Sequence, residues 1–269
     1  MVSVPCSLLN GSVDVDDDGK PLSTPFLQEI IKPPNVEALY DWYVNVQQKP
    51  DADPSWAILW PTAVSLATFL IDHQKKGGPL VNNQKVVELG CGLGLAGLTA
   101  ACLGAKSVLL TDREAFALHC AMSTAAVHNN NNNKQDLNVR AAILDWNDHA
   151  SMQTVAADFY QQTDLILASD VLYDATSIEA FAKVCQAMAS PGGAHVLVSD
   201  PVQERVPGAR KMLKEALQKH NHNDKKDVMI EELPMATPEE VTSLVATTMD
   251  GKDHARRMQE PTVILSISL

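Results

Sequence analysis

Glycines and acidic residues are spaced in this sequence as in a site that binds a nucleotide-like ligand. The apolar run KVVELG leads into the segment GCGLGLAG at residues 90–97. Glycine lets the backbone turn tightly and lets a ligand approach the main chain. The spacing of Gly92, Gly94 and Gly97 also fits the dinucleotide fingerprint GxGxxG. A strand-like run before the loop and a helix-like run after it favour a ligand-binding loop over a plain glycine turn, because the helix would offer free N–H groups to the ligand.

An acidic residue ends the next strand-like run. Asp112 follows SVLLT, at about the twenty-residue spacing from the glycines at which an acidic residue binds a ribose in nucleotide folds. A carboxylate there can accept both hydrogen bonds of a ribose diol. Asp112 could also cap a helix that starts at Glu114, and the sequence leaves both roles open.

Two later strand-like runs also end in residues that suit a bound ligand. One ends at Asp145-Trp146, where the carboxylate can accept from the exocyclic amine of adenine and the indole can stack on its ring; a core tryptophan is the alternative. The other ends at Ser169-Asp170, with Tyr173 close behind. Ligands of open α/β sheets bind outside the carboxyl ends of the strands. We therefore expect four strand ends to meet at one crevice.

The elements that must position these residues alternate along the chain. The expected strands are KVVELG, SVLLTD, VRAAILDW, DLILASD, GAHVLVSD, DVMIEEL and TVILSISL. Helix-like stretches separate them, one running through His128, one near Ser177–Ala189 and one near Gly208–Lys219. This alternation predicts an α/β fold with a doubly wound, mostly parallel, seven-stranded sheet. The polar tract Asn129–Asn133 is expected to be a solvated loop.

The chain divides into two parts by its pattern. Residues 1–53 are expected to form a partly flexible N-terminal extension with a helix near Val36–Gln48, packed on or near the cleft, and residues 54–269 to form the domain that holds the sheet. The acidic stretch DVDDDG at 14–19 matches half of a Ca²⁺ loop, but Pro25 stands where the loop needs a glutamate. His220-Asn221-His222 is interpreted as a polar helix end. No metal site is expected.

Composition restricts the partners. The formal net charge is −12, with no basic run beyond dipeptides, so no nucleic-acid partner is expected. No apolar run approaches the roughly 20 residues of a membrane-spanning helix, and the first ten residues carry no Lys or Arg. The five cysteines include no close pair, as in reduced intracellular proteins. These features predict a protein of the cytosol, with the nucleus as a second compartment, and leave the oligomeric state open.

Taken together, four segments resemble the class I (seven-β-strand) methyltransferases, which use S-adenosylmethionine (SAM). More narrowly, they resemble the family-16 methyltransferases, which include many protein lysine methyltransferases. The segments are WAILWPTAVSLATFL, VVELGCGLGLAGL, LDW and ILASDVLYD. The resemblance covers roughly 54–200 and, more loosely, the rest of the chain. It implies that 54–269 is a SAM-dependent methyltransferase domain and that the last strand, TVILSISL, is antiparallel.

The resemblance also implies roles for individual residues. The methionine part of SAM would pass over Gly90 to Gly92, the ribose would bind Asp112, and Trp146 would cover the adenine. The full set of expected cofactor-binding residues is Trp60, Glu88, Gly90, Cys91, Gly92, Asp112, Asp145, Trp146 and Ser169.

The expected catalytic residues, Asp170 and Tyr173, match the family's acid-x-x-tyrosine element near the substrate. A lysine nucleophile must be neutral, and a nearby carboxylate raises its pKa. Asp170 is therefore expected to draw in and orient the amine rather than to act as a strong base. A turn or cap role for Asp170 and a packing role for Tyr173 stay open.

The preferred function is SAM-dependent methyl transfer to a lysine of a protein substrate. Transfer to arginine or to a small-molecule amine would use the same pocket. A nicotinamide-dependent oxidoreductase suits the glycines and Asp112, but Asp145-Trp146, the WP element and the lack of a second substrate domain speak against it. A cofactor-binding scaffold without activity is the non-enzymatic alternative, which the presence of Asp170 and Tyr173 disfavours.

Overall fold

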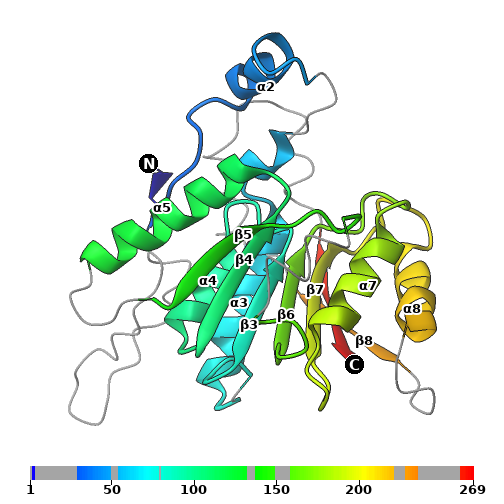
Figure 1. Ribbon diagram of the computed structural model, residues 1–269. Helices are drawn as coiled ribbons and strands as arrows, with labels where there is room; N and C mark the ends of the chain where they lie inside the picture. The colour runs from blue at the N-terminus through cyan, green and yellow to red at the C-terminus, as the bar shows by residue number, and fades with distance from the viewer. Residues whose placement is uncertain are drawn as a thin grey trace, which may run out of the picture.

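A single sheet organises the chain (Figure 1). The structure, a computed structural model, describes residues 2–3, 29–49, 54–78, 80–131, 137–148, 158–220, 228–235 and 261–269. Within these residues the sheet has seven strands, and its spatial order is β5 (Val139–Ile143), β4 (Ser107–Asp112), β3 (Lys85–Leu89), β6 (Leu165–Ser169), β7 (His195–Pro201), β9 (Thr262–Ser268) and β8 (Met229–Met235). Strand β9 pairs antiparallel with both β7 and β8, and the other neighbours pair in parallel. The expected fold class and the antiparallel last strand are confirmed.

Helices cover both faces of the sheet, as expected for a doubly wound fold. Helices α3 (Pro61–Lys75), α4 (Leu95–Cys102) and α5 (Ala115–Asn131) pack on one face, and α7 (Ile178–Met188) and α8 (Ala209–His220) pack on the other (Figure 1). Successive residues of a strand point to opposite faces. In β3, Val86 accordingly belongs to the core under α3 and α4, whereas Val87 belongs to the core under α7 and α8. The near-continuous apolar strands follow from this burial on both faces.

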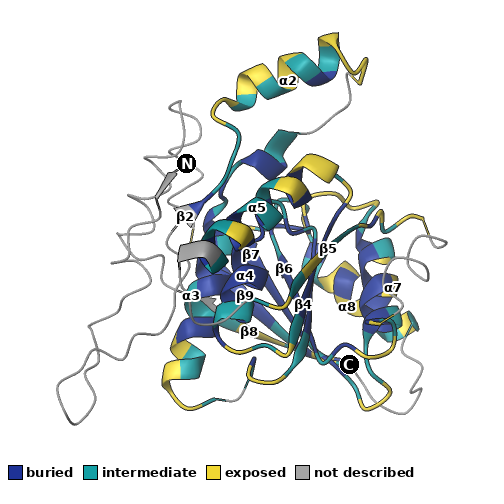
Figure 2. Cartoon of the chain, turned by 60° about the vertical axis from the view of Figure 1, so that its left-hand side comes forward, coloured by how far each residue is buried: buried dark blue, intermediate teal, exposed yellow. Residues whose placement is uncertain are grey.

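The described part of the N-terminal region contacts the sheet domain at helix α5 and at the residues just before it. It contains the short strands β1 (Val2–Ser3) and β2 (Glu29–Ile30) and helix α2 (Val36–Asn45), and the 3₁₀ turn η1 (Pro54–Ala57) begins the sheet domain after it. The N–H of Ile31 donates to the Thr124 hydroxyl of α5 at 2.9 Å. Helix α2 stands above the sheet domain and is largely exposed (Figure 2). Its N-terminus is capped by Asn35, whose side chain accepts from the N–H of Ala38, as capping residues do.

Two expected boundaries are wrong. Helix α2 ends at Asn45 rather than near Gln48, because Gln48 adopts a left-handed φ of 54° and its side chain donates to the Asn45 carbonyl. Helix α5 runs to Asn131, so the first part of the asparagine tract is helical. Asparagine is a weak helix former, but packing of the preceding turns overrides propensity. Asn129 then accepts from the N–H of Leu137 at 3.0 Å.

Other expectations fall partly outside the described residues. The acidic stretch at 14–19 and the two residues after His220 are among those that the structure does not describe. His220 itself ends α8 and contacts Glu179 at 3.2 Å. Across the described ranges, no helix is long and apolar enough to cross a membrane, and no three metal-ligating side chains cluster.

Gly97 is a position where the sheet and helix α4 leave no room for a side chain. A Cβ there would lie 2.4 Å from Leu110 Cδ2 and 2.7 Å from Glu88 Oε2. Both neighbours are fully buried. We predict that Gly97→Ala lowers the free energy of unfolding by about 1–3 kcal/mol, the usual cost of overpacking, although alanine is the better helix former.

Urea denaturation measures this change. The matched control is Gly192→Ala, where a Cβ would meet nothing within 4 Å, and a change within about 0.5 kcal/mol is expected there. A Gly97→Ala variant as stable as the wild type would mean that the two buried side chains can move aside.

Candidate functional site

A cavity of about 370 Å³ lies at the carboxyl ends of the central parallel strands. Its volume is in the range of small-molecule sites, about 300–1,000 Å³. It is lined by Ser55, Trp56, Ile58, Leu59, Trp60, Ala63, Gly90, Cys91, Gly92, Leu93, Gly94, Leu95, Asp112, Arg113, Glu114, Leu144, Asp145, Trp146, Asn147, Ser169, Asp170, Val171, Tyr173 and Arg205. All the expected site residues except Glu88 lie in this lining. The ends of β3, β4, β5 and β6 therefore meet at one place.

The glycine loop forms the floor of the cavity. Gly90 has a φ of 67° and Gly92 a φ of 51°, a left-handed backbone that glycine adopts at no steric cost. A Cβ on Gly90 would lie 3.2 Å from the Trp146 ring, and one on Gly92 would lie 3.2 Å from the carbonyl oxygen of Trp56. Side chains here would narrow the cavity. The loop thus needs glycine both for its backbone and for the space above it.

Asp112 ties the glycine loop to the end of β4. One of its carboxylate oxygens accepts from the N–H of Gly92 at 2.8 Å, and the other accepts from the N–H of Glu114 at 2.9 Å. The side chain lines the cavity although the residue is only 8% exposed. Helix α5 begins at Ala115, so the bond from Glu114 forms a turn before the helix and Asp112 is not its N-cap residue. Each carboxylate oxygen keeps a further lone pair for a ligand, so these backbone bonds do not exclude a ribose.

Glu88 acts behind the loop rather than at the cavity surface. The residue is fully buried on β3, and its carboxylate accepts from the N–H of Gly97 in the first turns of α4 at 2.8 Å. Burial, reinforced by the negative charge of Asp112, raises the pKa of Glu88 to about 8, although the hydrogen bond from Gly97 opposes the shift. Glu88 therefore fixes the start of α4 under the loop.

Trp146 and Cys91 give the cavity its apolar surface. The Trp146 ring packs against Phe181 of α7 with 5.2 Å between ring centroids. Its six-membered ring also lies next to Gly90 of the glycine loop. Asp145 beside it is exposed, and its carboxylate accepts from the N–H of Asn147 in a tight turn. Burial raises the pKa of the Cys91 thiol, so this side chain lines the cavity as a neutral group.

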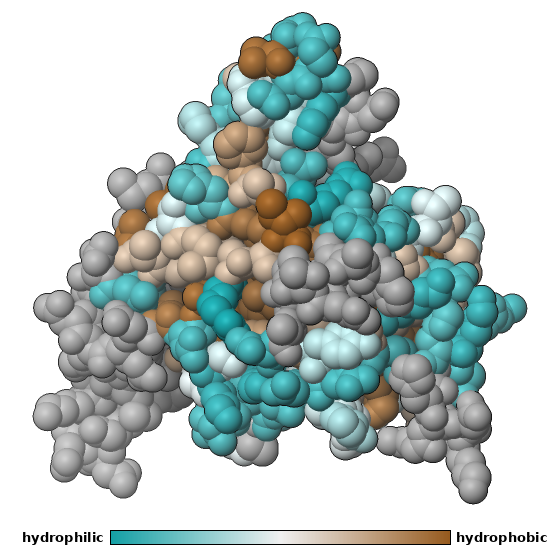
Figure 3. Space-filling view, viewed as in Figure 1, coloured by the Kyte–Doolittle hydropathy of each residue, from teal (hydrophilic) through white to brown (hydrophobic). Residues whose placement is uncertain are grey.

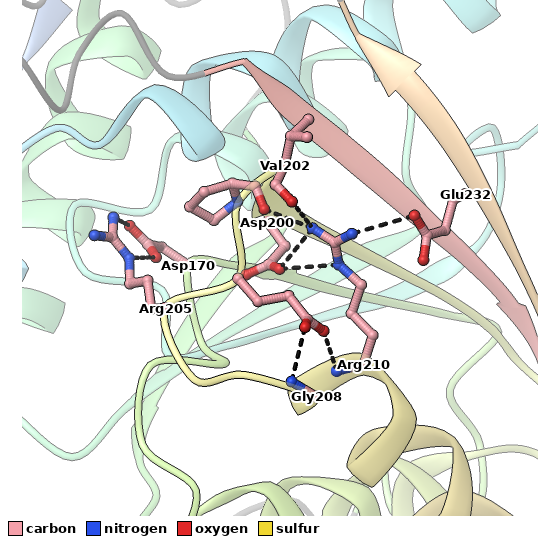
Figure 4. A network of polar contacts seen from close by, with 9 residues as sticks. Asp170, Asp200, Val202, Arg205, Gly208, Arg210 and Glu232 are labelled. Carbon is pink, nitrogen blue, oxygen red and sulfur yellow. Dashed lines mark hydrogen bonds and ion pairs between the residues drawn. The ribbon is translucent and has the colours of Figure 1, made fainter.

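A charged pair lines the cavity where β6 ends. Asp170 has a left-handed φ of 54°, and its two carboxylate oxygens accept from Nε and Nη2 of Arg205, each at 2.7 Å (Figure 4). The Arg205 guanidinium also lies 5.3 Å from the ring centroid of Trp60. A planar guanidinium matches a carboxylate in this two-bond geometry and is attracted to an indole face. Asp170 therefore has a counterion, Arg205, that its place at a strand end did not predict.

Sequence reasoning missed Arg205 for an identifiable reason. The fifth parallel strand, β7, also ends at this side of the sheet, and the loop after it, VQERVPG, carries the arginine. Applying the strand-end rule to β7 as well would have placed Arg205 near the crevice. In the same region Arg210 pairs with Asp200, and Glu204 accepts from the N–H groups of Gly208 and Arg210 at the start of α8 (Figure 4).

The N-terminal side of the cavity was also missed in part. Glu114 lines the cavity and accepts from the Tyr43 hydroxyl of α2 at 2.9 Å. Burial, with the nearby Glu114 carboxylate, raises the pKa of Tyr43 to about 12, so the phenol stays protonated and donates. Trp60 Nε1 donates to the Ser55 carbonyl at 3.0 Å, which holds the WAILWP segment against the cavity. Tyr173 lines the opposite side and is half exposed.

A family model described as lysine methyltransferase matches residues 44–219. The chain belongs to the lysine methyltransferase family. The matched range holds every strand that contributes to the cavity, and it includes the residues expected from the resemblance. A dehydrogenase, the more distant alternative, is therefore set aside.

Curated relatives of this lysine methyltransferase family member cover only part of its length. It is 27% identical over 163 residues to the electron transfer flavoprotein beta subunit lysine methyltransferase homolog of Caenorhabditis elegans, which covers 60% of this chain and 64% of that protein. It is 35% identical over 145 residues to protein N-lysine methyltransferase METTL21A of Danio rerio, with 53% and 59% covered. The chain spans 64%, 57% and 55% of the electron transfer flavoprotein relatives from C. elegans, Xenopus laevis and Danio rerio.

Solved structures share the fold of this family member. The [4+2]-cyclase SpnF has a TM-score of 0.52 at 14% identity, with 89% of this chain and 98% of that chain covered. The branched-chain polyamine synthase of Thermus thermophilus has a TM-score of 0.51 at 12% identity, with 77% and 55% covered. A cyclase and a polyamine synthase on one architecture show that the fold does not assign the reaction.

The raised pKa of Glu88 predicts a pH dependence of stability. Between the unfolded value of 4.5 and the folded value of about 8, the unfolded chain gives up the proton that the native state keeps. The free energy of unfolding of the wild type therefore falls as pH rises through this window. The slope is about 1.4 kcal/mol per pH unit, so the total loss is at most about 5 kcal/mol. Glu88→Gln cannot ionise, so its free energy of unfolding should fall less than that of the wild type over the same pH range.

Denaturation at pH 5 and at pH 8.5 measures the difference between the two proteins. Glu215→Gln, which removes an exposed carboxylate from α8, controls for the loss of one negative charge. A difference between wild type and Glu88→Gln that stays constant over this range would contradict the prediction.

Proposed function

We propose that this chain is a SAM-dependent methyltransferase that transfers a methyl group to lysine side chains of proteins. The observation that carries the proposal is the convergence of the glycine loop, Asp112, Trp146 and Asp170 on one cavity in a chain of the lysine methyltransferase family. The relatives are named for protein lysine methylation. A location in the cytosol, with the nucleus as a second compartment, stays a prediction.

The cavity residues fit the cofactor. Gly90 and Gly92 leave backbone exposed where a side chain would fill the space, and there the methionine part would lie. Each Asp112 oxygen accepts one backbone N–H and keeps a second lone pair, which would accept from a ribose hydroxyl. Trp146 and Asp145 would contact the adenine, and Ser169 would contact the cofactor at the end of β6. Trp60 and Cys91 would close the pocket with apolar surface.

The chemistry asks little of the protein beyond positioning. When bound, SAM supplies a methyl group on a sulfonium whose departure leaves a neutral thioether, so the leaving group needs no acid. Asp170 and Tyr173 line the cavity at the end of β6 and would orient the acceptor amine. Holding two reactants in line is a proximity effect that can account for much of the rate.

A protein acceptor fits the surface beside the cavity. Phe116, two residues after the cavity residue Glu114, is 45% exposed and contacts Trp42 of α2 at 5.2 Å between ring centroids. Tyr40 of α2 is also 45% exposed. Figure 3 shows hydrophobic surface running along α5 below α2. Exposed aromatic and apolar side chains of this kind mark contact surfaces for proteins.

Methyl transfer itself tests the proposal. The full chain is incubated with methyl-labelled SAM and a cell extract, and the labelled product is separated and digested for mass spectrometry. We expect label on lysine of a protein. Label on arginine or on a small molecule would contradict lysine as the methyl acceptor. Calorimetry that shows binding of NADH but not of S-adenosylhomocysteine would contradict SAM as the cofactor as well.

Asp112 should govern cofactor affinity more than stability. In Asp112→Asn, one amide oxygen can accept from Gly92 or from Glu114 but not from both, and the charge that strengthens the ribose bonds is lost. We predict at least a tenfold (about 1.4 kcal/mol) weaker binding of S-adenosylhomocysteine by calorimetry, since hydrogen bonds to charged groups contribute about 1.5–3 kcal/mol. Asp72→Asn on the exposed side of α3 is the control. Equal affinity of the two variants would limit the role of Asp112 to its bonds with the backbone.

A further inference from the structure

The ion pair between Arg205 and Asp170 stands where the proposed acceptor amine must bind. Both side chains line the cavity. The Asp170 side chain is 7% exposed and that of Arg205 is 23% exposed, so water screens the pair only in part. Two hydrogen bonds of 2.7 Å and the contact with Trp60 fix the guanidinium against the carboxylate.

A bare carboxylate at this place would hinder lysine methylation. The reaction needs a neutral amine, whereas the ordinary lysine pKa of about 10.4 keeps the side chain protonated near neutral pH. An opposite charge within a few ångströms stabilises the charged form of an amine and raises its pKa further. Asp170 alone would therefore bind the acceptor well as an ammonium ion and keep it unreactive.

The other charged groups around Asp170 do not offset its charge. Asp112, Glu114 and Asp145 line the same cavity, with Arg113 as a further cation. Asp200 of β7 lies close enough for Asp170 to affect its titration; burial raises the pKa of Asp200 to about 6, and Arg210 opposes the shift. Tyr173 and Asp174 follow Asp170 on its own loop. Carboxylates outnumber cations here, so Arg205 is the group in contact that neutralises Asp170.

We propose that Arg205 is a positioning residue that pairs with Asp170 so that the acceptor lysine loses its proton and reaches the methyl donor as a neutral amine. This inference rests on the proposed lysine methyltransferase function. The neutralised pair still presents carboxylate lone pairs that can orient an amine N–H, but it no longer favours the ammonium form. The proton that the ammonium releases goes to water before transfer.

The pH profile of methyl transfer tests this role. Arg205→Gln removes the charge and keeps a donor for Asp170, and Arg205→Lys keeps the charge without the two-bond geometry. With a lysine acceptor identified as above, we expect the alkaline rise of the rate to move up by about one pH unit in Arg205→Gln. Because one unit of pKa is a tenfold change in the neutral fraction of the amine, the rate of Arg205→Gln at pH 7 should be about one tenth of the wild-type rate. At high pH it should approach the wild-type rate.

Arg205→Lys should keep the midpoint of the wild-type pH profile. A structural role would lower the rate equally at every pH.

Binding of n-butylammonium gives a readout that does not depend on turnover. With S-adenosylhomocysteine present at pH 7, Arg205→Gln should bind this probe about tenfold more tightly than the wild type, because its carboxylate is uncompensated. The double variant Asp170→Asn/Arg205→Gln should lose the gain. Arg140→Gln, which breaks the exposed pair with Asp158, is the matched control and should behave as the wild type.

The outcomes separate the two proposals. A wild type that methylates no lysine would overturn the proposed function, and the n-butylammonium affinities would still decide the role of Arg205 in the ion pair. Arg205→Gln with the wild-type midpoint, or with no gain in affinity for the probe, would overturn the inference. If Arg205→Gln does not fold, Arg205→Lys and the double variant Asp170→Asn/Arg205→Gln are compared with the wild type instead. A double variant that binds n-butylammonium more tightly than the wild type would overturn the inference, because it has no Asp170 charge to attract the probe.

Discussion

The hydrogen bond from the N–H of Gly92 to the Asp112 carboxylate, 2.8 Å long, is the contact on which the cavity depends. It joins the loop after β3 to the end of β4, and the N–H of Cys91 adds a second link to the Thr111 carbonyl. Glu88 holds the far end of the same loop through Gly97. Buried backbone N–H groups need hydrogen-bond acceptors, and these two carboxylates accept from Gly92 and Gly97. They therefore hold the left-handed loop in one conformation.

Burying so many carboxylates around one cavity has an electrostatic cost that the protein meets in different ways. Glu88 is stabilised as the neutral acid, as its raised pKa indicates. Asp112 accepts backbone N–H groups. Asp170 and Asp200 each have an arginine, Arg205 and Arg210. A buried carboxylate needs a partner or must give up its charge, and the choice among these solutions sets which of the four carry a negative charge.

The two sides of the cavity are held in place in different ways. The sheet fixes the strand ends, and with them one side of the cavity, by regular strand pairing. The other side includes the turn at Pro54–Ala57, the start of α3 and the loop after β7, and α2 contacts this side through the hydrogen bond from Tyr43 to Glu114. Residues on loops and short elements can change without disturbing the core, so this side of the cavity can vary while the strand ends keep their places.

The sequence by itself determined the sheet and most of the cavity. The alternation of strand-like and helix-like runs predicted the seven strands. The carboxyl ends of parallel strands lie at the same edge of a sheet, so the positions of Gly90, Asp112, Trp146 and Asp170 at strand ends placed them together. Only the tertiary structure decided the partners of these groups. Local pattern could not show that Glu88 faces away from the cavity, that α5 continues to Asn131, or that Arg205 reaches Asp170 across 35 positions. Such contacts depend on the packing of whole elements, and neither hydrophobic period nor motif spacing records which side chains that packing brings within 3 Å.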